Sequence, residues 1–353
     1  MHFTKCTNLF SLLFRNCRFN IFAFLLIYSL GCSVLFCQEK FTISGYITDV
    51  ETNETLIGVN VLFPELNLGT STNEYGFYSI SIPKGDQKLL ISYLGFKNLT
   101  ETIKFYEDQT YNIKLLPQTE VLDEIIIKGN VEQLNLKSPQ MSVNSLAIST
   151  IKKMPAALGE VDIIKSITLL PGVTNAGEGS SGFNVRGGAV DQNLILLDEA
   201  IIFNSSHLFG FFSVFNPDAI KDIKLYKGGI PANYGGRVSS VLNIYQKDGN
   251  SNDFNAQGGI GLISSRVLLE GPLKKEKGSY LIGGRSSYVH LFLPLIESVK
   301  DNKAYFYDLN TKLSYTIDNK NNLFLSGYFG RDVFDIANLF NNAYGNSVAN
   351  FRW

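Results

Sequence analysis

The chain has 353 residues, of which 45% are hydrophobic, 12% aromatic and 18% charged, and its formal net charge is −1 at pH 7. This length fits two or three domains, and the hydrophobic content excludes disorder for most of the chain. The balanced charge argues against nucleic-acid binding through a basic surface. Disulfide scaffolds, thiolate metal sites and cysteine nucleophiles are excluded after residue 37, because the cysteines are Cys6, Cys17, Cys32 and Cys37.

The residues beyond this amino-terminal stretch lack the pattern of an enzyme. Only two histidines follow it, His207 and His290, which leaves few candidates for a metal site or a Ser-His-Asp site. Residues 177–182 fit Gly-x-Gly-x-x-Gly, but a dinucleotide site needs a strand before this motif and a helix after it, and the opposite order is expected here. We therefore expect no catalytic residues, no metal and no cofactor.

The first 37 residues have the features of a signal peptide. An uncharged apolar segment covers 21–37, and it is preceded by three basic residues, Lys5, Arg15 and Arg18. Two alternatives remain open. The segment is close to the length of a membrane-spanning helix, and residues 29–32 loosely resemble a lipobox, which would make Cys32 a lipid anchor. All three interpretations direct the chain out of the cytoplasm.

Residues 38–117 alternate apolar and polar side chains in short runs separated by turn residues. Examples are the runs 41–48, 59–63 and 78–82. Period-two patterning without a helical stretch predicts a small antiparallel β-sandwich. This segment resembles the carboxypeptidase-regulatory-like domain, which has a transthyretin-type fold. The resemblance implies an accessory domain and not a peptidase, because no His-x-x-Glu zinc pair is present.

The segment 118–138 is a polar linker that contains one short strand-forming run. The run consists of Leu122, Asp123, Glu124, Ile125, Ile126 and Ile127. An isolated strand in a linker has unpaired backbone groups and can add to the sheet edge of a partner. The alternative is an edge strand of the preceding sandwich.

Residues 139–246 change to a mixed α/β pattern. A helix is expected over 160–170, with Pro171 and Gly172 ending it. Glycine-punctuated strands follow. Seven ordered motifs in this segment resemble the plug domain of TonB-dependent outer-membrane receptors of the Bacteroidetes type; their main residues are Pro171, Gly172, Arg186, Gly187, Gly188, Asp198, Gly228, Gly229, Tyr234, Gly235, Gly236 and Arg237.

One departure from that family concerns Asp198. The family usually has Asp-Gly at this point, whereas Glu199 follows here, so we expect a turn of different shape. The resemblance implies that the strand 122–127 is a TonB-box-like segment that pairs with TonB. It also suggests Arg186 and Arg237 as partners in ion pairs between plug and barrel. An aromatic loop is a candidate ligand contact, with burial inside the plug as the alternative; its residues are Ser206, His207, Phe209 and Phe211.

Residues 247–353 have the pattern of a transmembrane β-barrel. Between 305 and 317, apolar residues such as Tyr307 and Leu309 form one face of a strand, and polar residues such as Asp308 and Lys312 form the other. This suits lipid on one side and a wet lumen on the other. The alternative is a soluble β-sandwich, but the alternation is longer than soluble strands usually are.

Six antiparallel strands are expected in this last third, near 254–262, 264–271, 279–289, 305–317, 323–331 and 347–353. Short turns at 273–278 and 318–322 are assigned to the periplasm, and long joins at 290–304 and 332–346 to the exterior. Six strands do not close a barrel. The sequence is therefore expected to be the amino-terminal part of a longer receptor.

The expected fold is mainly β: a transthyretin-like β-sandwich, an α/β plug and about six barrel strands. The resemblance implies a receptor in the cell outer membrane, in contact with its lipid, with the amino-terminal domain in the periplasm. TonB and its inner-membrane energising complex would power import of an extracellular solute such as a siderophore, cobalamin, an oligosaccharide or a peptide. A surface lipoprotein is a further candidate partner. The alternative function is an exported binding or adhesion module without transport activity.

Overall fold

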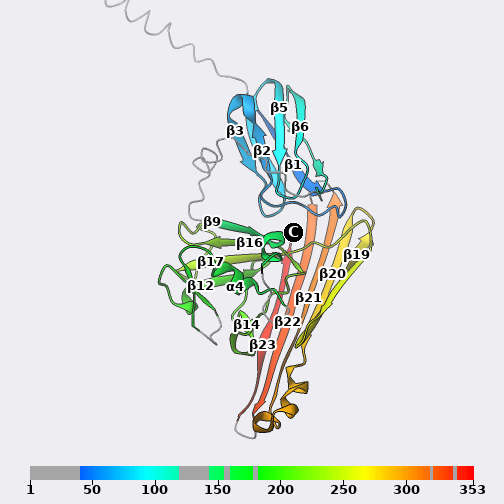
Figure 1. The fold of residues 1–353 in the computed structure, drawn as a ribbon. Helices are drawn as coiled ribbons and strands as arrows, with labels where there is room; N and C mark the ends of the chain where they lie inside the picture. The colour runs from blue at the N-terminus through cyan, green and yellow to red at the C-terminus, as the bar shows by residue number, and fades with distance from the viewer. Residues whose placement is uncertain (1–39, 119–142, 155–159, 178–181, 319–320, 337–339) are drawn as a thin grey trace, which may run out of the picture.

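The structure is a computed structural model that describes residues 40–118, 143–154, 160–177, 182–318, 321–336 and 340–353. Three parts follow one another (Figure 1): a β-sandwich at 40–118, a mixed domain at 143–246, called the plug, and a sheet of long strands at 255–352, called the wall. Residues 247–254 are called the connector. The predicted leader and the predicted TonB-box-like strand lie outside the described residues. Within those residues, no helix combines the length and apolarity needed to cross a membrane.

The sandwich consists of two packed sheets. One has the order β4-β1-β7, with β8 also pairing with β1, and the other has the order β3-β2-β5-β6. Inward residues such as Ile43 and Ile47 of β1 are fully buried, which matches the predicted period-two pattern. The strands are β1 (Lys40–Asp49), β2 (Asn60–Phe63), β3 (Leu68–Ser71), β4 (Phe77–Pro83), β5 (Gly85–Ser92), β6 (Leu99–Phe105), β7 (Gln109–Thr110) and β8 (Ile113–Leu115).

The plug is built on a five-stranded sheet with the order β13-β12-β17-β16-β9. The central pair, β12 and β17, is parallel and buried along its whole length, whereas the other pairs are antiparallel. Central strands covered on both faces read as continuous apolar runs, as β12 does. The bounds are β9 (Val143–Ala147), β12 (Asn193–Leu197), β13 (Ala200–Ile201), β16 (Ile220–Tyr226) and β17 (Ser240–Gln246).

Short hairpins and helical turns complete the plug. The hairpins pair β10 with β11 and β14 with β15. A two-residue turn, Asp198 and Glu199, joins β12 to β13, and both residues have positive φ, +45° and +71°. The elements are α3 (Ile148–Ile151), α4 (Ile163–Ile167), β10 (Val173–Asn175), β11 (Phe183–Val185), η2 (Val190–Gln192), β14 (Ser206–His207), η3 (Leu208–Gly210) and β15 (Phe212–Ser213).

The helix predicted over 160–170 is shorter than expected, because it begins only after Asp162. The backbone of Asp162 is extended, and its side chain accepts a hydrogen bond from the amide of Lys165 at 3.0 Å, which is the geometry of a helix N-cap. Glu160 therefore lies outside the helix. It is free to point toward the wall.

The wall is a six-stranded antiparallel sheet in chain order. Six strands were predicted, and six are present. The predicted long join at 332–346 is wrong, because β22 and β23 pair through most of it, for example Asp332 with Tyr344. The strands are β18 (Asn255–Ile260), β19 (Ser264–Lys274), β20 (Gly278–Ser287), β21 (Lys303–Asp318), β22 (Asn321–Ile336) and β23 (Phe340–Arg352), with η4 (Val289–Leu291), η5 (Leu293–Leu295) and η6 (Glu297–Val299) between β20 and β21.

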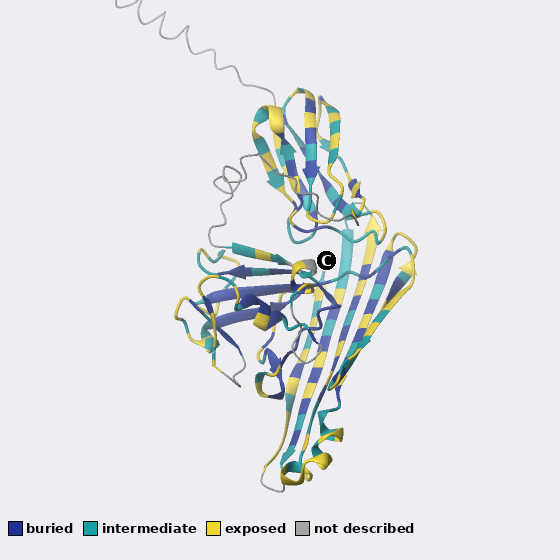
Figure 2. Cartoon of the chain, viewed as in Figure 1, coloured by how far each residue is buried: buried dark blue, intermediate teal, exposed yellow. Residues whose placement is uncertain are grey.

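The two faces of the wall differ in burial (Figure 2). Along β21, Asp308, Asn310 and Lys312 are buried against the plug, whereas Leu309 and Leu313 are 44% and 40% exposed. The predicted alternation is therefore present, with the polar residues facing inward. The sandwich lies at the end of the wall where the short turns between β19 and β20 and between β21 and β22 are found (Figure 1).

Candidate functional site: the interface of plug and wall

The plug contacts the wall through charged side chains that are almost completely buried. His207 of β14 is 1% exposed and inserts between β21 and β22. Its Nδ1 lies 2.8 Å from Oδ2 of Asp332, and its Nε2 lies 3.2 Å from Oδ2 of Asp308. The ring stacks on Phe306 with centroids 4.2 Å apart. Both nitrogens thus face a carboxylate, an arrangement that requires both to carry protons.

The charge of this histidine follows from its neighbours. Burial lowers the pKa of an imidazole, but the hydrogen bonds with Asp308 and Asp332 outweigh burial and raise the pKa of His207 above its ordinary value. The hydroxyl of Tyr328 also lies 3.2 Å from Nε2. The described geometry is that of an imidazolium paired with two carboxylates of the wall.

A second buried ion pair lies beside the first, and in this one the wall supplies the cation and the plug supplies the carboxylate. Arg285 of β20 is 3% exposed, and its Nε and Nη2 donate to Asp308 at 2.9 and 2.6 Å. Its Nη1 donates to Glu160 of the plug. The other oxygen of Glu160 accepts from the hydroxyl of Ser264 at 3.0 Å. Asp308 therefore joins the His207 contact to the Arg285 contact in one buried network.

Two further contacts distribute charge over the rest of the interface. Asp218 of the plug accepts from Arg266 of β19 at 2.7 Å and from Lys152 at 2.8 Å. Burial raises the pKa of this carboxyl, but the two cations outweigh burial and hold it below its ordinary value. Lys312 of β21 lies 3.3 Å from Asp198 and 2.9 Å from Asp248. Ion pairs therefore connect the plug to β19, β20 and β21 of the wall.

Apolar packing between plug and wall is confined to a few places. The aromatic ring of Tyr328 belongs to the core of the plug, together with residues such as Phe215 and Ile244. A separate cluster joins Leu208 and Phe212 of the plug to Phe306 and Phe334 of the wall. This cluster also touches Ile263 and Val289, which places it at the end of the wall opposite the sandwich.

Comparison with known proteins matches two parts of the chain to known domain families. Residues 43–127 match the family described as CarboxypepD_reg-like domain, and residues 137–241 match the family described as TonB-dependent Receptor Plug Domain. The chain is 26% identical over 228 residues to TonB-dependent receptor SusC of Bacteroides thetaiotaomicron, an alignment that covers 60% of this chain and 21% of SusC. The chain thus carries a carboxypeptidase-regulatory-like domain followed by a TonB-dependent receptor plug domain, and it is similar to Bacteroidetes TonB-dependent receptors.

Two further comparisons are similar. TonB-dependent receptor P39 of Formosa agariphila is 26% identical over 252 residues, which cover 67% of this chain and 22% of P39. Among solved structures, the siderophore receptor PirA from Acinetobacter baumannii aligns with a TM-score of 0.42 and 21% identity, over 57% of this chain and 33% of that chain. The chain spans about a fifth of the length of the curated relatives it matches.

The glycine motifs of the receptor plug lie in loops beside the central sheet. Gly187 has a φ of +81°, a conformation that side chains disfavour, and a Cβ on Gly188 would lie 2.2 Å from Oγ of Ser239. The carbonyl of Pro171 accepts from Nζ of Lys227 at 2.9 Å, and the hydroxyl of Tyr234 accepts from Nδ2 of Asn243 at 3.0 Å. These contacts join the loops that carry the motifs to each other and to β17.

The charged residues of the plug motif differ in burial. Arg186 and Arg237 are both exposed, and Nη1 of Arg237 donates to the carbonyl of Gly236 at 3.1 Å. Asp198 is buried, and its Oδ1 accepts from the amide of Gln246 at 2.9 Å. The ion pairs from the plug to the wall include those of Glu160, His207, Asp218, Asp198 and Glu199.

The candidate ligand loop divides into a buried and an exposed part. Ser206 and His207 are buried, whereas Phe209 and Phe211 are 49% and 56% exposed. The ring of Phe209 lies 4.1 Å from that of Phe334 on β22. Exposed aromatic rings at the end of the wall opposite the sandwich remain candidates for contact with a solute, whereas His207 contacts the wall.

The sequence patterns did not single out Glu160, Arg285 or Asp332. A signal was present for part of this set, since polar residues alternate along the inner face of β21, and Arg285 occupies an equivalent inward position on β20. The signal identifies the inward face but not which inward residues form pairs. Glu160 was hidden by the helix predicted over it, and Asp332 by the loop predicted over it.

Proposed function

We propose that the chain is the amino-terminal part of an outer-membrane receptor that binds an extracellular solute and imports it with energy delivered by TonB. The observation that carries this proposal is the polar interface between plug and wall. Buried ion pairs add little net stability, because desolvation offsets much of their attraction. An interface of this kind can separate in a hydrated lumen without exposing a large apolar surface, as transport past a plug requires.

The lengths of the turns support an orientation for the proposed receptor. Outer-membrane barrels have short turns on the periplasmic side and longer loops outside. The short turns of the wall lie beside the sandwich, and η4 to η6 lie at the opposite end. We therefore place the sandwich in the periplasm and the exposed rings of Phe209 and Phe211 on the extracellular side. The exposed apolar residues of the wall, such as Leu309 and Ile282, face lipid in this arrangement.

The linker at 119–142 connects the sandwich directly to β9, which is an edge strand of the plug sheet. Within the described residues β9 pairs with β16, from Asp222 with Ala147 to Tyr226 with Val143. A force on the linker therefore acts first on an edge strand. Edge strands have one hydrogen-bonded neighbour and open at a lower free energy than central strands. This supports the segment 122–127 as the contact with TonB.

The alternative of an adhesion module without transport is not favoured, because the relatives of the chain are receptors. The test uses the full receptor and the purified periplasmic domain of TonB. Ile125→Pro removes a backbone donor from the strand 122–127 and should abolish binding of that domain. The matched control Asn135→Pro changes the linker outside the strand and should leave binding unchanged. Equal binding by both variants and the unmodified receptor would refute the TonB contact.

Import is measured separately, in cells with and without the gene. The probes are a labelled ferric siderophore, cobalamin, an oligosaccharide and a peptide. Uptake of one probe that depends on the gene and is lost in Ile125→Pro supports the proposed function. Adhesion of cells without gene-dependent uptake of any probe supports the alternative.

A further inference from the structure

The sandwich is attached to the rest of the receptor by a defined polar surface. Its docking face consists of the turn at residues 51–55 and the turn at residues 74–75. The carbonyl of Thr52 accepts from the amide of Ser251 in the connector at 3.1 Å, and the carbonyl of Glu51 accepts from Nδ2 of Asn252 at 2.8 Å. Nδ2 of Asn53 donates to the carbonyl of Glu276, in the turn between β19 and β20, at 3.3 Å.

One ammonium group at the centre of this face belongs to the plug. Nζ of Lys221, on β16, lies 2.9 Å from Oδ2 of Asp248 in the connector and 3.5 Å from Oε1 of Glu54 in the sandwich. It also donates to Oγ1 of Thr55 at 3.1 Å. The amide of Asp248 donates to Glu54 at 3.0 Å, which closes the group. Lys221, Glu54 and Asp248 are 11%, 16% and 13% exposed.

Further ion pairs connect Asp248 to the wall. Oδ1 of Asp248 lies 2.9 Å from Nζ of Lys312 on β21, and that ammonium lies 3.3 Å from Asp198 at the turn between β12 and β13. Acidic and basic groups thus alternate from the sandwich, through the plug and the connector, to the wall and back to the plug. Burial lowers the pKa of Lys221, but Asp248 and Glu54 outweigh it and raise that pKa, so the ammonium is charged.

A second set of contacts also joins the sandwich, the plug and the wall. The hydroxyl of Tyr75 in the sandwich donates to Oε1 of Glu199 in the plug at 2.9 Å. The guanidinium of Arg352, on β23, lies 4.4 Å from the ring of Tyr75 and 4.3 Å from that of Phe324. Its Nη1 is 3.6 Å from Glu199. The three parts of the receptor therefore meet a second time, at the plug turn that departs from the family pattern.

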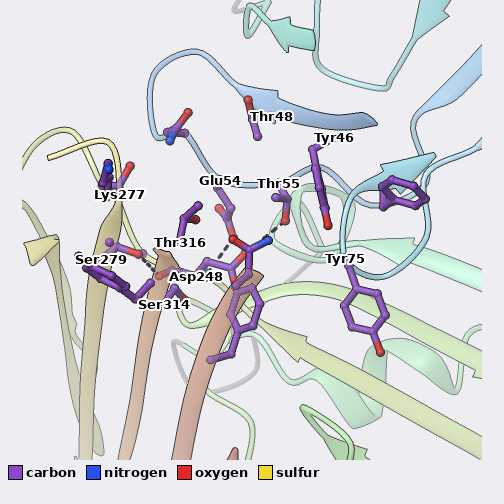
Figure 3. A pocket seen from close by; sticks show the side chains of 18 of the residues that line it. Tyr46, Thr48, Glu54, Thr55, Tyr75, Asp248, Lys277, Ser279, Ser314 and Thr316 are labelled. Atoms are coloured by element: carbon purple, nitrogen blue, oxygen red, sulfur yellow. Dashed lines mark hydrogen bonds between the residues drawn. The ribbon is translucent and has the colours of Figure 1, made fainter. Parts of the chain in front are cut away.

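The space around the docking face is open. A cavity of about 730 Å³ lies between the sandwich, the connector and the wall, and it is lined by side chains such as Tyr46, Thr48, Ser279 and Thr316 (Figure 3). Contacts around an open cavity can separate without exposing a hydrophobic core. The sandwich keeps its own core when it leaves, because that core is formed by its own strands.

We propose that docking of the sandwich and seating of the plug are energetically coupled, with Lys221 as the shared group. When the sandwich leaves, Lys221 loses Glu54 and Thr55 and keeps Asp248. When β16 moves, the same ammonium leaves both carboxylates. Coupling between two such contacts is reciprocal, so a change confined to the sandwich must alter the stability of the plug strand. This goes beyond the proposed transport function, because it holds for any solute.

The test changes the sandwich and measures the plug in the full receptor. Glu54→Ala removes the carboxylate that contacts Lys221. Glu51→Ala is the matched control, because it removes a carboxylate from the same turn and Glu51 contacts the connector through its backbone carbonyl. Hydrogen exchange of the β16 amides, which pair with β9, reports on the plug. Spin labels at Leu94→Cys and Lys275→Cys, both exposed positions, report on docking.

The expected result is a narrow distance distribution between the labels in the unmodified receptor and in Glu51→Ala. Glu54→Ala should broaden the distribution and accelerate exchange in β16 by about five-fold or more, the lower end of typical coupling between sites. Broadening with unchanged exchange would overturn the coupling. A broad distribution in the unmodified receptor, or no response to Glu54→Ala, would overturn the docking itself. Lys221→Met should reproduce both effects if the ammonium is the shared group.

Discussion

Nδ1 of His207 lies 2.8 Å from Oδ2 of Asp332, across 125 residues of sequence. The other oxygen of Asp332 accepts from the amide of Leu208, also at 2.8 Å. One wall carboxylate therefore binds both the side chain and the following backbone amide of the plug. Because Asp308 faces the opposite nitrogen of the ring, the contact depends on the imidazolium form, and this dependence can be measured.

The first prediction concerns pH. His207 has a raised pKa in the folded receptor, so its stabilisation is fully present below the unfolded value of about 6.5 and is lost as pH rises through the folded value. The groups that face the ring are Asp308, Asp332 and Tyr328, with Arg285 beyond Asp308. Nitrogen-15 NMR of labelled histidine should therefore show that both ring nitrogens of His207 stay protonated to a higher pH than those of a free imidazole.

The signal is assigned with two variants, because the described residues contain two histidines. The resonance that disappears in His207→Gln belongs to His207, and the one that disappears in His290→Gln belongs to His290. The plug should also lose stability against heat as pH rises above neutrality, and this loss should be absent in His207→Gln. A His207 ring that loses its second proton at or below the pH at which a free imidazole does so would contradict the prediction.

The second prediction concerns the partner of that histidine. Asp332→Asn keeps the size of the side chain but leaves a buried imidazolium beside a neutral amide. Breaking a buried pair from one side costs about 3–5 kcal/mol, and we expect the lower end of this range because Asp308 still contacts the ring. Asp335→Asn on the same strand is the control, since Asp335 is only partly buried. Urea unfolding of both variants measures the difference, and equal midpoints would rule out the ion pair.

The third prediction concerns Arg285. Arg285→Lys should behave almost like Arg285→Met, because a single ammonium cannot reproduce the donors that the guanidinium directs to Asp308 and Glu160. Each variant should destabilise the plug by about 3 kcal/mol or more. Adding Glu160→Gln to Arg285→Met should recover part of that loss, which a double-mutant cycle measures. Full stability in Arg285→Lys would show that the fork geometry does not matter.

The sequence predicted the strands of this receptor better than its contacts. Alternation gave the number of wall strands and the inward face of the strand over 305–317, because a strand with one polar and one apolar side has a fixed pattern of period two. The alternation failed over residues 332–346, where a loop was predicted. Asparagines and glycines are frequent in this segment, but the end of β22 and most of β23 lie within it and pair with each other. Two asparagines of β23, Asn346 and Asn350, donate to the carbonyls of Asn204 and Asp198 in the plug.

The interface network was beyond the reach of local patterns for a different reason. Glu160 and Arg285 are 125 residues apart, and neither has an unusual neighbourhood in the sequence. Their pairing results from the way the plug packs against the wall. The positive φ of Glu199 is an intermediate case, since the missing glycine predicted a different turn but not the contacts with Tyr75 and Arg352.

The last prediction concerns that turn. Glu199 has a φ of +71°, a conformation that costs a residue with a side chain about 1 kcal/mol relative to glycine. Its side chain is 38% exposed, so the ion pair with Arg352 contributes about 0–1 kcal/mol. Glu199→Gly should therefore leave the thermal stability of the plug unchanged or slightly raised. It should weaken docking of the sandwich, because the acceptor of Tyr75 is lost.

Glu199→Gln separates these two effects. It keeps the backbone penalty and an oxygen for Tyr75 but removes the charge that faces Arg352, so docking should weaken less than in Glu199→Gly. The spin-label distance between the sandwich and the wall measures docking, and calorimetry measures the plug. A clear loss of plug stability in Glu199→Gly would mean that the contacts of this side chain outweigh its backbone strain. In that case the glutamate would stabilise the plug directly, and would not act chiefly by joining the sandwich to the plug.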